Sequence, residues 1–209
     1  MSIVTISASY GAAGAEIAPL VAERLGLPFH DRAIPAQVAG RLGVPVAEAE
    51  ANDETVLGGL WRLVASLGTM PDPVGGVLPV SGVPDARAYR QQTERILGEV
   101  AEGAGGVVLG RAAALVLADR PDALHVRLDG PAERRLAAAV ARSGRTREEV
   151  RREMAAADRS REAYVRHFYR CDPAESRHYH LVVDSTALPV ETVVDLIITA
   201  AQGRGVGRA

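Results

Sequence analysis

Short apolar runs alternate along this chain with longer stretches in which apolar residues recur every three or four positions. Three of the runs are continuously apolar, which is typical of strands covered on both faces, and one alternates apolar with polar residues. The five candidate strands are Ile3–Ile6, Leu27–His30, Val107–Leu109, Leu124–Leu128 and Leu181–Asp184.

The stretches between these runs have the spacing of amphipathic helices. The predicted helices are Glu16–Leu25, Arg32–Leu42, Val46–Gly59, Ala86–Ala104, Ala132–Ser143, Arg147–His167 and Pro189–Gln202. Strands that alternate with helices indicate an α/β fold in which a parallel sheet is doubly wound between two helical layers. We therefore expect a single three-layer domain over residues 1–202.

Two segments interrupt this alternation. Residues 68–84 contain four prolines and four glycines, which favours a flexible loop. Residues 203–209 (GRGVGRA) are expected to form a frayed tail. The chain shows no internal repeat and no segment with the composition of a domain linker.

Composition narrows the classes of function. A net charge of −2 provides no field that would recruit nucleic acid or a membrane surface. Cys171 is the single cysteine, and no Cys/His spacing resembles a zinc site, so we predict no metal-ligating side chains. No stretch approaches about 18 apolar residues, and the first residues lack the pattern of a signal peptide. We expect a cytoplasmic protein with neither a membrane nor a nucleic-acid partner, and the sequence leaves its oligomeric state open.

The first strand leads into a small-residue loop, Ser7–Gly14, and then into a helix. This order is typical of a phosphate-binding loop, in which backbone N–H groups and a helix N-terminus surround an anion. The usual pattern ends in Gly-Lys-Ser/Thr, but this chain has no lysine, and Gly14 stands at the lysine position. The candidate phosphate-binding residues are Gly11, Ala12, Ala13, Gly14, Ala15 and Glu16. Alternatively, the small residues serve only a tight turn from strand to helix, with Glu16 as a capping residue.

Six segments, taken in their order and spacing, resemble the cytidylate kinase-like family of P-loop nucleoside monophosphate kinases. They are ISASYGAAGAEIA, LGLPFHDR, VVLGRAA, VRLDGPAERRLAA, MAAADRSREAYVRHFYRCD and YHLVVDSTALPVETVVDLI. The resemblance extends from Ile3 to about Ala201. It implies a five-stranded sheet in the order 2-3-1-4-5, with ATP and Mg²⁺ as cofactors. It also implies a nucleoside monophosphate, CMP or dCMP, as the phosphate acceptor.

The phosphate loop departs from the family pattern. Members often carry a lysine-free loop that resembles SREYGSGGREIA, in which arginines flank the glycines. Here Ala8 and Ala15 occupy the arginine positions, and Ala13 occupies a glycine position. This removes cations from the place where phosphoryl transfer most needs them.

Several polar residues follow the predicted strands at the edge where open α/β sheets bind ligands. Asp31 and Arg32 follow the second strand, and the resemblance implies that the acceptor-binding region begins there. Arg111 follows the third strand directly, at a Gly-Arg where the resemblance places an arginine that contacts the monophosphate. For Asp31 and Arg32, a helix N-cap with a solvated neighbour is an equal alternative.

The resemblance also implies a lid-like region at about residues 142–161. Arg142, Arg159 and Arg161 are its candidate catalytic cations, because phosphoryl transfer depends on positive charge around the moving phosphate. Asp158 would orient an arginine, and Arg135 and Asp158 are further candidates for substrate binding. For any one of these residues, a solvated helix face is the alternative.

Three functions are compatible with these residues. The first is ATP-dependent phosphoryl transfer to a nucleoside monophosphate. The second is nucleotide or phosphate binding without catalysis, which the alanines of the loop favour. The third is a kinase of another small hydroxylated substrate.

Overall fold

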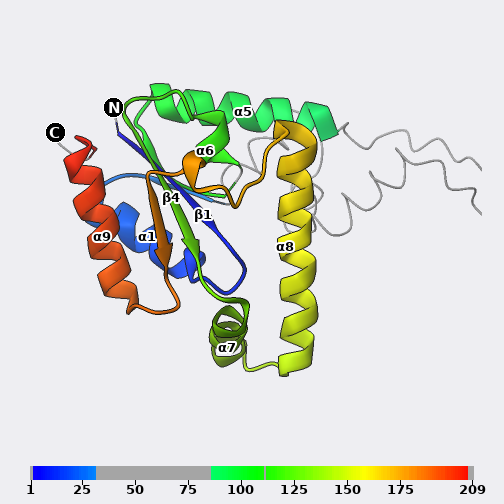
Figure 1. The fold of residues 1–209 in the computed structure, drawn as a ribbon. Coiled ribbons are helices and arrows are strands. Elements are labelled where there is room, and N and C mark those ends of the chain that lie inside the picture. The colour runs from blue at the N-terminus through cyan, green and yellow to red at the C-terminus, as the bar shows by residue number, and fades with distance from the viewer. Residues whose placement is uncertain (1, 32–85, 111, 207–209) are drawn as a thin grey trace, which may run out of the picture. The chain divides into compact units, whose positions relative to one another are not determined.

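The computed structural model of the chain describes residues 2–31, 86–110 and 112–206 (Figure 1). Within these residues five strands form one sheet, in which every pairing is parallel. They are β1 (Ile3–Ala8), β2 (Phe29–His30), β3 (Gly106–Leu109), β4 (Ala123–Asp129) and β5 (Leu181–Asp184). Their order, β2-β3-β1-β4-β5, confirms the predicted fold class and strand order.

The described helices are α1 (Gly14–Leu25), α5 (Ala86–Glu102), α6 (Ala113–Val116), α7 (Ala132–Ser143), α8 (Arg147–Tyr169) and α9 (Val190–Gly203), with a 3₁₀ turn η1 (Ser176–His178). The pattern did not predict α6 and η1, which are too short to show helical periodicity. The lid-like region expected at residues 142–161 falls on the end of α7 and the first part of α8. The helices predicted at Arg32–Leu42 and Val46–Gly59, and the loop predicted at residues 68–84, lie outside the described residues.

The internal contacts divide the chain into two units. One unit combines Met1–Asp31 with Leu97–Ala209, and the other is Arg32–Ile96. All the contacts described below lie within the first unit. The single domain expected over residues 1–202 stays a prediction.

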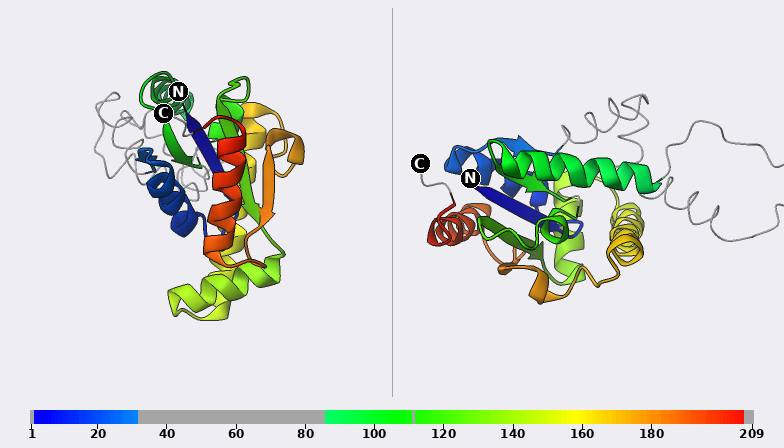
Figure 2. Two further views of the ribbon diagram at one scale, coloured as in Figure 1. Left: turned by 90° about the vertical axis from the view of Figure 1, so that its left-hand side faces the viewer. Right: turned by 90° about the horizontal axis from the view of Figure 1, so that it is seen from above.

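The sheet of the first unit has helices on both faces. Helices α1 and α9 pack side by side on one face, and α8 runs along the other (Figures 1 and 2). Val4, Ile6, Val126, Ile17 and Ile197 are completely buried between the sheet and the α1–α9 layer. Burying each such side chain contributes about 1.5–3 kcal/mol, so these positions on the strands and helices are apolar.

The central position of β1 brings two turns together at the carboxyl edge of the sheet. Ala8 at the end of β1 is in register with Leu128 of β4, and the next N–H, of Ser9, donates to the Leu128 carbonyl at 3.1 Å. The β1–α1 loop therefore lies beside the β4–α7 turn. Parallel sheets of this type bind their ligands at this edge.

The end of the described chain is packed rather than frayed. Arg204 Nε donates to the Ala123 carbonyl at 2.9 Å, and Val206 is buried. The expected frayed tail is therefore wrong for residues 203–206, because Val206 adds an apolar side chain to the core; residues 207–209 lie outside the described part. No helix among the described residues is long and apolar enough to cross a membrane.

Candidate phosphate-binding site

The loop between β1 and α1 has the backbone conformation of an anion-binding turn. Ala13 has a left-handed conformation (φ 58°, ψ 20°) and precedes the first residue of α1. Gly11 also has a positive φ, of 81°. Residues that depart in this way from right-handed backbone point successive N–H groups toward a common centre. The positive end of the α1 dipole adds to the attraction for an anion.

Side chains from two other segments hold the carbonyl groups of this loop. The Tyr10 carbonyl accepts from Arg135 Nη1 at 2.8 Å, and the Ala12 carbonyl accepts from Ser185 Oγ at 2.8 Å. The Gly11 carbonyl accepts a longer hydrogen bond, of 3.4 Å, from Arg142 Nη1. In a trans peptide, a carbonyl and the N–H of the next residue point in opposite directions. Holding these carbonyls therefore also fixes the direction of the N–H groups that follow them.

Four N–H groups of the loop and the first helical turn are left for a ligand. Within the described part of the chain, the N–H groups of Gly11, Ala13, Gly14 and Ala15 donate no hydrogen bond to the protein. The other two candidates differ, because Ala12 N–H donates to Ser9 O at 3.1 Å and Glu16 N–H donates to Ala13 O at 3.0 Å. The predicted phosphate site is thus reduced by two donors. Its remaining four can surround an anion without a lysine.

Both glycines of the loop are also required for packing. A Cβ on Gly11 would lie 2.3 Å from the Arg135 carbonyl oxygen, and a Cβ on Gly14 would lie 2.5 Å from the Ala8 Cβ. The loop can approach α7, and α1 can approach β1, only because no side chain intervenes. The structural explanation for small residues therefore holds beside the functional one.

Arg142 and Glu16 face each other beside the loop. Arg142, in the last turn of α7, places its Nε 3.7 Å from Glu16 Oε2, in addition to its bond to the Gly11 carbonyl. Both side chains are about half exposed, so the pair contributes at most about 1 kcal/mol. A phosphate in the loop would compete with Glu16 for this guanidinium.

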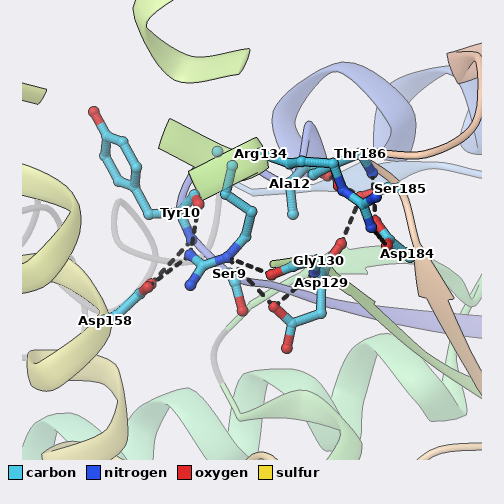
Figure 3. A network of polar contacts seen from close by, with 12 residues as sticks. Ser9, Tyr10, Ala12, Asp129, Gly130, Arg134, Asp158, Asp184, Ser185 and Thr186 are labelled. Carbon is cyan, nitrogen blue, oxygen red and sulfur yellow. Dashed lines mark hydrogen bonds and ion pairs between the residues drawn. The ribbon is translucent and has the colours of Figure 1, made fainter. Parts of the chain in front are cut away.

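Arg135 and Asp158 form an ion pair next to the loop, and Figure 3 shows Asp158 facing Tyr10. Arg135 Nη1 lies 2.7 Å from Asp158 Oδ2, and Asp158 Oδ1 accepts from the Tyr10 N–H at 3.0 Å. Arg135 Nε donates to the Gly130 carbonyl at 3.0 Å, and only 11% of the Arg135 side chain is exposed. These partners occupy both side chains. The structure therefore places the two residues, expected to bind substrate, where they hold the loop.

A model of the cytidylate kinase-like family matches residues 3–187. The chain belongs to this family. The residues that this family model matches include the loop described above. As a member of the cytidylate kinase-like family, the chain has the strand order and the lysine-free loop that its sequence suggested.

Two solved structures show the same fold. An uncharacterised protein from Eubacterium ventriosum superposes with a TM-score of 0.68 at 17% identity, over 97% of this chain and 99% of that one. A shikimate kinase from Bacteroides thetaiotaomicron gives a TM-score of 0.51 at 14% identity, over 96% and 98% of the two chains. At these identities the likeness concerns the fold alone.

One curated relative is a uronate isomerase from Corynebacterium glutamicum. It is 30% identical over 139 residues, which are 66% of this chain and 26% of that protein. The match therefore spans about a quarter of the relative's length. A similarity confined to part of a longer protein does not carry that protein's activity to this kinase-like chain.

The remaining lid arginines of this kinase-like chain differ in their surroundings. Arg161 Nη1 lies 3.6 Å from Asp158 Oδ1, and 53% of its side chain is exposed. Partial desolvation, together with the positive charge of Arg135, lowers the pKa of Arg161, although a guanidinium stays protonated at neutral pH. Arg159 is exposed and forms no ion pair with the described residues. Arg142 is thus the candidate cation that directly contacts the loop.

The candidate residues of the acceptor side are not assembled in the described structure. Asp31 is the last described residue after β2, while Arg32 and Arg111 lie outside the described residues. Gly110, just before Arg111, has a φ of 76°, and its N–H donates to the Ile6 carbonyl at 2.9 Å. Gly110 therefore lies at the carboxyl edge of the sheet, next to β1.

Sequence reasoning missed a polar network that supports the start of the loop. Arg127 Nη2 donates to Ser9 Oγ at 3.1 Å and to Asp129 Oδ2 at 2.7 Å, and Arg127 Nη1 donates to the Pro173 carbonyl. Burial acts to raise the pKa of Asp129, but the bonds from Arg127 and Gly130 outweigh it, so this pKa is lowered. Polar residues two apart at the end of β4 were the available signal, because they share one face of the strand.

Proposed function

We propose that the chain catalyses ATP-dependent phosphoryl transfer to a nucleoside monophosphate, CMP or dCMP. The observation that carries this proposal is the set of four N–H groups, of Gly11, Ala13, Gly14 and Ala15, that have no partner among the described residues at the N-terminus of α1. Such a set fits the phosphates of a nucleotide through backbone donors alone. Family membership supports phosphoryl transfer in general, and the choice of CMP or dCMP rests on the family resemblance.

Arg142 supplies the cation that a loop lysine would otherwise provide. It already contacts the loop at Gly11, and a planar guanidinium can bind two phosphate oxygens at once. Arg161 and Arg159 on α8 supply further positive charge as the acceptor oxygen bonds to the γ-phosphorus and the bond to the leaving ADP oxygen breaks. Asp31, Arg32 and Arg111 bind the acceptor in this proposal.

Mg²⁺ would be held mainly by the nucleotide and water. Among the described residues there is no cluster of three or more ligating side chains, but kinases often bind Mg²⁺ through one or two carboxylates and the substrate phosphates. Glu16 is the half-exposed carboxylate beside the loop and would reach the ion through water. The bound ion would neutralise negative charge on the donor phosphates.

A second candidate, nucleotide binding without transfer, is favoured by the Glu16–Arg142 pair. In this case the carboxylate keeps the guanidinium away from the transferring phosphate, and the loop has no other cation of its own, because Ala8 and Ala15 are neutral. The two candidates agree on ATP binding and differ on turnover.

A coupled ADP-release assay with ATP, Mg²⁺ and CMP, dCMP, UMP, AMP or shikimate separates these functions. We expect turnover with CMP or dCMP, and shikimate represents the third class of small hydroxylated acceptors. ATP binding measured by calorimetry without turnover of any acceptor would support the second candidate. The absence of ATP binding would contradict both.

Arg142→Ala should lower kcat by about 100-fold or more, because loss of one preorganised donor to a developing charge costs about 10²–10³ in rate. Arg142→Lys keeps the charge but loses the planar fork, so it should fall between wild type and Arg142→Ala. The matched control is Arg24→Ala, which removes another half-exposed arginine, one that pairs with Asp195 on α9. Equal activities for Arg142→Ala and Arg24→Ala would remove Arg142 from the mechanism.

A further inference from the structure

Tyr10 is joined to the α7–α8 hairpin through both its backbone and its side chain. Its N–H donates to Asp158 Oδ1 of α8 at 3.0 Å, and its carbonyl accepts from Arg135 Nη1 of α7 at 2.8 Å. Its ring points away from the polar network around Asp129 (Figure 3). It packs against a small buried cluster formed by Leu136, Ala139, Val150 and Met154 of the two helices.

This cluster is separate from the main core of the sheet. Its members come from α7 and α8, and the Tyr10 ring packs on them from the phosphate loop. A hairpin whose own apolar residues contact a loop side chain cannot move away without exposing that surface to water. The loop and the hairpin are therefore connected by apolar contact as well as by hydrogen bonds.

The Tyr10 hydroxyl stays neutral in these surroundings. Burial and the negative charge of Glu153, which also hydrogen-bonds to it, raise the pKa of Tyr10, while Arg145 and Arg161 partly oppose the shift. The residue therefore acts through its ring and its peptide groups, and it needs no ionised hydroxyl.

We propose that Tyr10 is a positioning residue that fastens the phosphate loop to the α7–α8 hairpin, so that the two respond to a bound anion as one unit. The proposal builds on the function proposed above, in which the loop binds ATP. A loop held in its binding conformation loses little conformational freedom when it takes up phosphate, and this preserves affinity without a lysine. Without the Tyr10 contacts, the loop would lose conformational freedom when ATP binds, and the affinity for ATP would fall.

The test is ATP titration by calorimetry for Tyr10→Ala, Tyr10→Phe and Ile197→Val, at a temperature where circular dichroism shows each variant folded. Tyr10→Phe keeps the ring and both peptide groups, so its Kd should stay within about twofold of wild type, whereas Tyr10→Ala should weaken binding about tenfold. Ile197→Val trims the main core on the other face and controls for lost stability, and it should bind ATP like wild type. Wild-type affinity in Tyr10→Ala, or an equal loss in Ile197→Val, would overturn the proposal.

Met154→Ala tests the same contact from the side of the hairpin. Met154 lies in the cluster on α8 and belongs to no proposed ligand contact. Its truncation should weaken ATP binding in the same direction as Tyr10→Ala. Unchanged affinity would count against coupling through the cluster.

Hydrogen exchange without ligand separates failure of this inference from failure of the proposed function. In Tyr10→Ala, the hydrogen-bonded amides of residues 9, 10 and 12 and of α8 around Asp158 should exchange about tenfold faster together, while Ile197→Val leaves both groups of amides unchanged. If wild type binds no ATP, the proposed function fails, and these exchange rates alone decide on the Tyr10 connection. Unchanged exchange in Tyr10→Ala would reject it.

Discussion

Ala15 is an exposed residue in the first turn of α1, and its N–H is one of the four that remain for an anion. In the family pattern an arginine stands at this position. Because the side chain is in solvent, a charge can be placed here with little effect on packing. The position therefore isolates the contribution of a loop cation to nucleotide binding.

Ala15→Arg should tighten ATP binding by about tenfold, because a charge-assisted hydrogen bond to phosphate is worth about 1.5–3 kcal/mol and solvent screens part of it. Ala15→Asp places a negative charge at the same point and should weaken binding by a similar factor. Calorimetric titration at low and at physiological salt measures both, and the two effects should shrink as salt is added. If neither substitution changes affinity, the phosphates do not lie at the start of α1.

The elements of the fold were largely predictable from the sequence. The limits of Ala132–Ser143 and Leu181–Asp184 were predicted correctly, because periodicity and turn residues mark both ends. Helix α6, at Ala113–Val116, has a single turn and therefore no periodic signal. Helix α8 continues two residues past the predicted end, to Tyr169, because Arg170 adopts the left-handed conformation that ends it without a glycine.

At the level of the loop, Gly11→Ala should destabilise the protein by about 2 kcal/mol or more, since it combines a positive φ with a clash against the Arg135 carbonyl. The matched control is Gly98→Ala in α5, where an added Cβ meets no atom within 4 Å. This control should be neutral or stabilising by up to about 1 kcal/mol, because alanine favours helix. Urea denaturation measures the free energy of unfolding of both variants. Equal values would show that Gly11 is not in close contact with α7.

At the scale of the whole molecule, contacts between distant segments decide the site. Sequence reasoning located the loop from its small residues but did not find what holds it. Arg135 and Ser185 are separated from their loop partners by 125 and 173 positions. No local pattern encodes a contact at that separation, since the three-dimensional order of the strands creates it. For the same reason, a charge run on α8 could not reveal that Asp158 accepts from Tyr10.

A pair of histidines connects β1 and β4 to the residue before β5, with His125 of β4 buried and His180 exposed. Thr5 Oγ1 lies 2.8 Å from His125 Nδ1, and the His125 N–H donates to His180 Nδ1 at 2.9 Å, with the two rings stacked. Burial, reinforced by the nearby charge of His180, lowers the pKa of His125 to about 4, and burial also lowers the pKa of His180. Protonation of His180 Nδ1 would remove the acceptor of this bond.

This pair predicts acid sensitivity of the whole fold. The unfolded chain binds a proton at His125 near pH 6.5 and the folded chain only near pH 4, so stability is complete above about pH 6.5 and falls as the pH drops. Between about pH 7.5 and about pH 5 the loss from His125 should be about 2 kcal/mol. His125→Gln should lose this part of the pH dependence, as urea denaturation of both proteins at the two pH values would show. Parallel pH profiles would mean that His125 does not titrate as inferred.

The separation between the loop and its supports has a consequence for synthesis. The phosphate loop leaves the ribosome before its supports, since Ser185, which holds the Ala12 carbonyl, follows 173 residues later. A nascent chain that stops before β5 lacks this support, and one that stops before α7 also lacks Arg135 and Arg142. The loop is therefore made before the residues that complete it, and a partly made chain would not sequester ATP through this loop.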